Sequence, residues 1–189
     1  MRQLHKGLER DHKLKYFGRQ YGLFLKGAGL SMEDSLLFFQ RAFSQFTVEQ
    51  FQKQYTYNIR HMYGKEVKRS NYSPYSCTKI ILGQPPQNEY HHGCPFKHYD
   101  DLGLESLLSS LQISTNDRDA IMTQKRTRNF QLARVKHFEA VHRNALGKEV
   151  INLDGVGNHP TAWFNASMIY YESTKNEMSK DENMVKSEI

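Results

Sequence analysis

Apolar residues recur along most of the chain at the three- and four-residue spacing that is typical of amphipathic helices. Leu36, Phe39 and Phe43, for example, fall on one stripe of a single helix. The pattern predicts helices over residues 2–14, 31–46, 74–82, 100–111, 116–126, 129–144 and 160–172. The expected fold class is therefore mainly α.

Short polar motifs mark where several of these helices begin. Ser31 and Thr47 each resemble the first residue of a capping motif, in which the side chain accepts a hydrogen bond from the next turn. The Ser73-Pro74 pair predicts another start, because proline suits the first helical position. Residues 54–63 fit either a strand or a helix, so the pattern also allows a small β-ribbon.

The length of 189 residues favours one domain. We place this domain at residues 1–172 and expect residues 173–189 to form a charged flexible tail, because they lack aromatic residues and alternate charges of both signs. No apolar run is long enough to cross a bilayer, and no N-terminal stretch has the pattern of a signal peptide. The expected environment is intracellular, where cysteines stay reduced.

Aromatic and basic residues stand out in the composition, with 11 Tyr, 11 Phe and a formal net charge of +6. So many rings indicate a packed core rather than a disordered chain. Residues 1–30 hold seven basic residues against two acidic ones, and residues 51–70 hold five against one. This uneven charge favours an acidic partner such as nucleic acid, although a solvated basic face fits the same counts.

Two patches interleave aromatic and basic residues, one at residues 19–27 and one at residues 55–61. If the patches share a face, cationic side chains can contact phosphates while rings stack on bases. The first patch offers Arg19, Tyr21 and Lys26, and the second offers Tyr55, Tyr57, Arg60 and His61. The alternative is that the rings belong to the core and the charges are solvated.

Two cysteines, Cys77 and Cys94, lie in otherwise unrelated settings, and histidines surround the second. Lone cysteines in a reduced protein are usually buried apolar residues, but a Cys/His metal site is also open. The chain lacks a phosphate-binding P-loop, a nucleophile elbow and a compact cluster of carboxylates for two magnesium ions. It is therefore not expected to polymerise nucleotides itself.

Several segments together resemble one family, the C-terminal domain of the large subunit of eukaryotic and archaeal DNA primase. They include Gly-Arg-Gln-Tyr-Gly-Leu-Phe-Leu-Lys-Gly at 18–27, Tyr-Thr-Tyr-Asn-Ile-Arg-His-Met-Tyr-Gly-Lys-Glu at 55–66 and His-Gly-Cys-Pro-Phe-Lys-His at 92–98. Residues 1–6, 72–82, 138–142 and 159–160 add further matches in the same order. The resemblance extends from residue 1 to about residue 172.

The resemblance implies a mainly helical domain that binds a DNA template, an RNA primer and the primer's 5′-triphosphate during DNA replication in the nucleus. It implies two protein partners, the catalytic subunit of primase and DNA polymerase alpha, and no membrane. Such a domain is a non-catalytic accessory of primer synthesis. The nucleic-acid contacts implied by matching motifs are Arg19, Tyr21, Lys26, Tyr55, Tyr57, Arg60 and His61.

The resemblance also implies a [4Fe–4S] cluster with four cysteine ligands. Cys77 and Cys94 match the second and third ligands, and the first would precede Met1. The fourth position holds Arg134, which shares a helical face with Phe138 and must therefore extend to solvent or find a partner. Three interpretations stay open: no cluster, a histidine ligand such as His137, or zinc held by the two cysteines and nearby histidines. We favour the first.

Two other function classes also stay open. The first is a degenerate, cluster-free module that keeps the helical fold and binds nucleic acid or protein without a role in priming. The second is a metal-dependent hydrolase that uses cysteine and histidine ligands, against which the missing carboxylate cluster argues.

Overall fold

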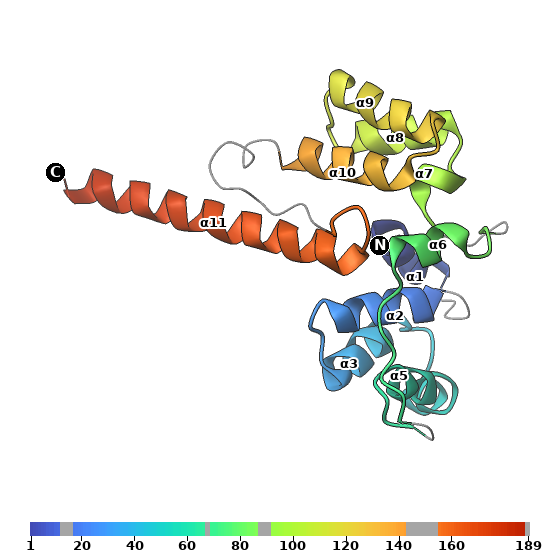
Figure 1. The fold of residues 1–189 in the computed structure, drawn as a ribbon. Helices are drawn as coiled ribbons and strands as arrows, with labels where there is room; N and C mark the ends of the chain where they lie inside the picture. Colours follow the sequence, from blue (N-terminus) through green and yellow to red (C-terminus); the bar gives the residue numbers. More distant parts are fainter. Residues whose placement is uncertain (12–16, 67–68, 87–91, 143–154, 188–189) are drawn as a thin grey trace. The chain divides into compact units, whose positions relative to one another are not determined.

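The computed structural model describes residues 1–11, 17–66, 69–86, 92–142 and 155–187. Helices account for all of the regular structure within these ranges (Figure 1), which confirms the predicted mainly α fold. The small β-ribbon that the sequence allowed is not found among the described residues. The chain divides into two compact units, Met1–Cys94 and Pro95–Ile189, and each is described by itself.

The first unit is built around helix α2 (Phe17–Gly27), which contacts α1 (Arg2–Asp11), α3 (Met32–Ala42) and α5 (Tyr57–Met62). Its core is rich in phenylalanine and leucine because α1, α2 and α3 each turn one apolar stripe inward. The buried core residues are Leu4, Leu8, Tyr21, Leu23, Phe39, Phe43, Phe51, Ile59 and Met62.

Capping explains where α3 and α4 (Val48–Phe51) begin. The Ser31 hydroxyl accepts a hydrogen bond of 3.0 Å from the backbone of Asp34. Thr47 accepts from the backbone of Gln50 at 3.3 Å, and the Gln50 side chain accepts from the backbone of Thr47 at 2.9 Å. These reciprocal bonds satisfy backbone donors that a helix leaves open at its start, so both predicted starts are confirmed.

Residues 54–63, for which the sequence left strand and helix open, are helical. Helix α4 continues through a π-helical turn, η1 (Gln52–Thr56), directly into α5. Phe51, Ile59 and Met62 are buried, and their spacing turns one face of this segment toward the core. A π-helical turn shifts the side chains that follow it around the helix axis, and such turns are frequent at functional sites.

Helix α6 (Cys77–Leu82) begins three residues later than the Ser73-Pro74 pair predicted. Ser76 supplies the cap, since its hydroxyl accepts from the backbone of Lys79 at 3.1 Å. Residues 69–76 carry no helix. The Tyr72 carbonyl instead accepts a hydrogen bond of 2.9 Å from Lys26 on α2, a tertiary contact that fixes this stretch in a non-helical path.

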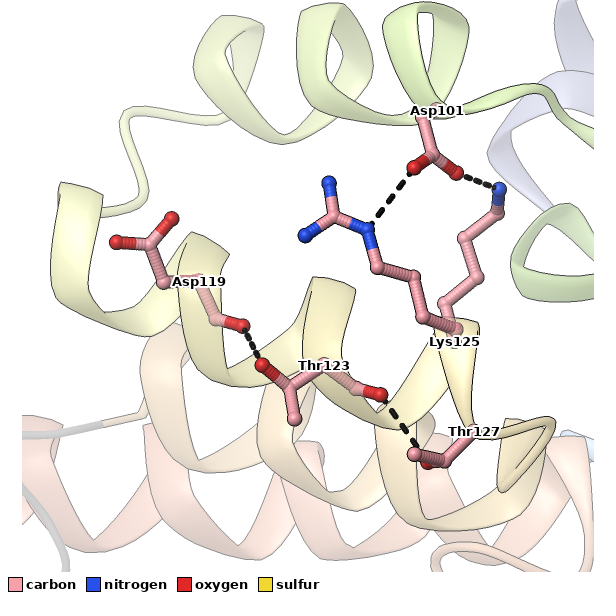
Figure 2. A network of polar contacts seen from close by, with 6 residues as sticks. Asp101, Asp119, Thr123, Lys125 and Thr127 are labelled. Carbon is pink, nitrogen blue, oxygen red and sulfur yellow. Dashed lines mark hydrogen bonds and ion pairs between the residues drawn. The ribbon is translucent and has the colours of Figure 1, made fainter.

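The second unit contains α7 (Pro95–His98), α8 (Asp101–Ser110), α9 (Thr115–Arg126), α10 (Phe130–Val141) and α11 (Pro160–Ser187). Asp100 and Ser114 cap α8 and α9 by accepting from the backbones of Gly103 and Asp117. Figure 2 shows how α8 is joined to α9: Asp101 accepts from Lys125, and also from Arg126 at 3.0 Å. The end of α9 is thereby tied to the start of α8.

Helix α10 packs against α9 and α7, and its C-terminal end joins an aromatic cluster with α11. His142 is fully buried there: its Nδ1 lies 2.9 Å from the Phe138 carbonyl oxygen, and its Nε2 lies 2.9 Å from the Ser167 hydroxyl. A carbonyl oxygen can only accept, so Nδ1 carries the proton and Ser167 donates to Nε2. Burial lowers the pKa of His142, and its hydrogen bond to the Phe138 backbone opposes that shift.

The predicted tail at residues 173–189 continues as helix α11 as far as Ser187. These residues are thus helical as far as Ser187, whereas the flexibility of the charged tail stays a prediction. The placement of a single domain at residues 1–172 stays a prediction, because the division at Cys94 separates two packing units and does not locate a domain end.

Candidate nucleic-acid interface

All seven residues predicted to contact nucleic acid lie in the first unit. Arg19, Tyr21 and Lys26 are on α2, and the others follow one another through η1 and α5. Helices α2 and α5 contact each other, so the two predicted patches are brought to neighbouring elements. The seven residues nevertheless differ sharply in exposure and in the contacts they make.

Tyr21 and Tyr55 are core rings. Tyr21 is 7% exposed, and its hydroxyl lies 3.1 Å from Nδ1 of His5. The Tyr55 ring is half-buried and stacks on Phe43, with ring centroids 4.8 Å apart and an interplanar angle of 8°. For these two rings the structure shows the packing role that the sequence left open as the alternative. A stacking role for them stays a prediction.

Lys26 is held on three sides by the protein. Its Nζ donates to the carbonyl oxygens of Met62 and Tyr72, each at 2.9 Å, and to the Asn71 side chain. An ammonium group has three N–H donors, so all of them are used in this conformation. Partial burial also lowers the pKa of Lys26. Lys26 therefore joins α2 to the end of α5 and to the segment before α6.

Four side chains, those of Arg19, Tyr72, His61 and Tyr57, form a continuous row that we call the ring row. The Arg19 guanidinium lies over the Tyr72 ring, 4.8 Å from its centroid. The Tyr72 and His61 rings are 4.9 Å apart, and the His61 and Tyr57 rings are 6.0 Å apart. The two ends of the row, Arg19 and Tyr57, are exposed to solvent.

The row has an exposed guanidinium at one end and an exposed aromatic ring at the other. This arrangement suits a single strand of nucleic acid, which offers phosphates and unpaired bases. Arg19 has no acidic partner among the described residues, so its charge is available to a phosphate. Tyr57 is 51% exposed and offers a ring for stacking. A base that stacks on an aromatic side chain gains about 1–3 kcal/mol, largely independent of sequence.

Arg60 differs from Arg19 because it has a carboxylate partner. Its Nε lies 2.6 Å from Oε1 of Glu66, and the Arg60 side chain is 44% exposed. Exposed ion pairs contribute little to stability and are easily exchanged. A phosphate can therefore compete with Glu66 for Arg60, and Glu66 weakens any phosphate contact that Arg60 makes.

Tyr72 is the residue that the sequence patches missed. It lies outside both of them, in a non-helical segment, and Lys26 binds its carbonyl oxygen. The signal that could have found it was the 72–82 motif, which sequence reasoning used for the family resemblance and not for the site.

Comparison with known proteins identifies the family and is consistent with the mainly α fold. Residues 1–164 match the model of the family described as the C-terminal domain of the large subunit of eukaryotic and archaeal DNA primase. The chain belongs to this family. It is 44% identical over 170 residues to the DNA primase large subunit of Homo sapiens, covering 87% of this chain and 32% of the human protein.

Other family members show similar coverage. The probable DNA primase large subunit of Arabidopsis thaliana is 41% identical over 169 residues, with 88% of this chain and 36% of that protein covered. The large subunit of Dictyostelium discoideum is 38% identical over 182 residues, with 95% and 37% covered. This primase-family chain thus spans about a third of the length of the relatives it matches.

The residues of this family member do not fit the four-thiolate site that the family resemblance implies. Cys77 is buried at the start of α6, and Cys94 is half-buried just before α7. The position of the fourth ligand is Arg134, whose Nε donates to the carbonyl oxygen of Val156 at 3.0 Å. A guanidinium stays protonated in proteins and has no lone pair for iron, so this side chain cannot replace a thiolate.

The two alternative metal sites also lack support among the described residues. No group of three or more His, Cys, Asp or Glu side chains is close enough there to hold a metal ion. His137 lies between Phe96 and Trp163, each ring centroid 6.0 Å away, and burial lowers its pKa to about 4.

None of the described helices has the length and apolar character to cross a membrane.

Proposed function

We propose that this domain binds the junction between a single-stranded DNA template and an RNA primer, including the primer's 5′-triphosphate. It would do so as the C-terminal domain of a primase large subunit, in the nucleus, during DNA replication. The observation that carries the proposal is the ring row, in which Arg19 and Tyr57 are exposed at opposite ends.

The two ends of the row would recognise different parts of the ligand. A phosphate would bind at Arg19, whose planar guanidinium can donate two parallel hydrogen bonds to it. An unpaired base would stack on Tyr57, next to His61. Arg60 would add a second phosphate contact after exchanging its bond to Glu66. The 5′-triphosphate, which concentrates negative charge, would gain most from two nearby cations.

The domain would assist primer synthesis without performing it. Its contribution is to hold template and initiating nucleotide in place, which lowers the entropic cost of joining nucleotides. Bond formation would belong to the catalytic subunit of primase, and DNA polymerase alpha would be the second partner.

A second candidate is favoured by Arg134. A family member whose fourth ligand position holds a hydrogen-bonded arginine would keep the helical fold and the ring row without an iron–sulfur cluster. It would then be a cluster-free module that binds nucleic acid or protein. The ring row lies in the first unit and Arg134 in the second, so the two candidates are tested by variants of different residues.

The test is binding of a fluorescein-labelled single strand to the full chain, measured by anisotropy from 50 to 300 mM salt. The proposal expects the logarithm of the affinity to fall linearly with the logarithm of the salt concentration, by roughly 0.7 for each phosphate contacted. The test variant is Arg19→Leu, which removes one exposed cation of the row. It should lower both the affinity and the slope of its salt dependence. Absence of binding at low salt would overturn the proposal.

A further inference from the structure

Tyr72 lies outside both predicted patches, yet other side chains of the first unit hold its ring in place. Tyr72 lies ten residues beyond the end of α5, in a stretch with no helix of its own. Such a stretch usually lets a tyrosine sample many orientations. Here the ring is half-buried and packs against the apolar core of the unit, so its orientation is restricted.

Lys26 supplies the anchor for this stretch. Its ammonium group donates to the Tyr72 carbonyl oxygen, to the neighbouring Asn71 side chain and to the Met62 carbonyl oxygen at the end of α5. The same group lies 5.4 Å from the centroid of the Tyr63 ring, a distance at which a cation is attracted to the ring. One side chain of α2 therefore fixes both ends of the connection between α5 and Tyr72.

The Tyr72 ring joins two parts of the site that would otherwise be separate. It contacts the Arg19 guanidinium at 4.8 Å and the His61 ring at 4.9 Å, and its hydroxyl lies 3.4 Å from Nε2 of His61. Without this ring, the cation on α2 and the rings on α5 have no common aromatic surface between them. A ring beneath a guanidinium also limits the orientations that the guanidinium adopts.

We propose that Tyr72 is a nucleic-acid-binding residue, which presents a stacking surface between Arg19 and His61 to an unpaired base of a single strand. Lys26 acts as its positioning residue and does not itself contact phosphate. This inference rests on the proposed function and names two roles within it. It changes the prediction for Lys26, because a lysine whose three donors are used by the protein contributes through the geometry of Tyr72.

The experiment places 2-aminopurine, whose fluorescence is quenched by stacking, at successive positions of a single strand and titrates the full chain. The Tyr72→Leu variant should bind about tenfold more weakly and lose quenching at one position, whereas Tyr72→Phe should keep both. Tyr75→Leu is the matched control. Tyr75 lies on the same stretch, packs against the same core and has Lys79 over its ring at 4.1 Å, but is not part of the row.

The Lys26→Met variant separates positioning from phosphate contact. Positioning predicts weaker binding and loss of the same quenching signal, with the wild-type salt slope retained. Direct phosphate contact predicts a slope that is smaller by roughly 0.7 and unchanged quenching, and this result would overturn the role given to Lys26. Retained affinity and quenching in Tyr72→Leu would overturn the role given to Tyr72.

A measurement on the unaltered chain covers the case in which Tyr72→Leu does not fold. Photo-crosslinking of a strand that carries 5-iodouracil, followed by mass mapping, should label the peptide that contains Tyr72. Crosslinks found only on other peptides contradict the inference. If the wild-type chain binds no nucleic acid at all, the proposed function itself fails, whereas binding with an indifferent Tyr72 removes this inference alone.

Discussion

The Nε atom of Arg134 donates a hydrogen bond of 3.0 Å to the carbonyl oxygen of Val156, at a position where the family resemblance implies a cysteine ligand. Val156 is fully buried and belongs to the core cluster that also contains Phe138. The bond therefore joins α10 to the turn that precedes α11. A residue that the sequence marked as out of place has a defined structural role.

Replacing Arg134 by methionine should destabilise the protein by about 1–2 kcal/mol, because the Val156 carbonyl loses a charged donor in a partly buried site. Urea denaturation measures the change. Arg126→Met is the matched control: Arg126 pairs with Asp101 at 3.0 Å on an exposed surface, and such a pair is worth about 0.5 kcal/mol or less. Equal losses of unfolding free energy in the two variants would show that the Arg134 bond contributes no more to stability than an exposed ion pair.

Iron should not reach cluster stoichiometry in this chain. Arg134 lies at the position implied for the fourth ligand, and a guanidinium cannot replace a thiolate there. The measurement is anaerobic purification followed by a visible spectrum and by quantification of iron, sulfide and zinc on the same sample. Roughly four irons per chain with matching sulfide would mean that other ligands complete a cluster. Stoichiometric zinc without sulfide would instead indicate a Cys/His site.

Stability should fall as the solution is acidified through the range set by His137. Burial, with the charges of Arg134 and His142, lowers the pKa of His137 from 6.5 to about 4. The unfolded chain therefore binds this proton before the folded chain does as pH falls. The full stability is present above pH 6.5, and up to about 3 kcal/mol is lost as pH falls toward 4.

The variant that tests this assignment is His137→Phe, which removes the titrating group and keeps a ring between Phe96 and Trp163. Urea midpoints measured from pH 4.5 to 7 should depend less on pH in the variant than in the wild type. His142 and His92, whose pKa values are also lowered by burial, contribute to the dependence that remains. An identical pH dependence in the two proteins would remove His137 from the explanation.

Glu66 should weaken nucleic-acid binding by pairing with Arg60. Its carboxylate holds Arg60 at 2.6 Å, so Glu66→Gln should free the guanidinium and raise the affinity for a single strand several-fold. Arg60→Ala should lower the affinity and reduce the salt slope by roughly 0.7. Anisotropy titrations at two salt concentrations measure both effects. An unchanged slope in Arg60→Ala would exclude a phosphate contact by Arg60.

Local sequence signals predicted the helices well, because their causes are local. Ser31 and Thr47 begin helices through bonds within one turn, and Arg134 found a polar partner because a charged group on an apolar helical face needs one. The start of α6 was predicted too early. The Ser73-Pro74 pair favoured the earlier start, whereas Ser76 supplies the cap and the Tyr72 carbonyl before it is bound by Lys26.

The candidate site was predicted only in part, since ring burial is a tertiary property. Tyr55 sits among polar neighbours in the sequence just as Tyr57 does, yet Tyr55 stacks on Phe43 and Tyr57 is exposed. Tyr72 belongs to the ring row, and its carbonyl oxygen accepts a hydrogen bond from Lys26, which lies 46 residues earlier in the chain. No pattern of spacing within either patch contains that information.

The central claim is that this chain recognises a primer end together with an unpaired template strand, and competition between two junctions tests it most directly. Both junctions have the same template overhang, and the RNA primer carries either a 5′-triphosphate or a 5′-hydroxyl. We expect the triphosphate form to bind at least tenfold more tightly at 150 mM salt, and Arg19→Leu to abolish most of that preference. Equal affinity for the two junctions, or a preference that Arg19→Leu leaves intact, would contradict the claim.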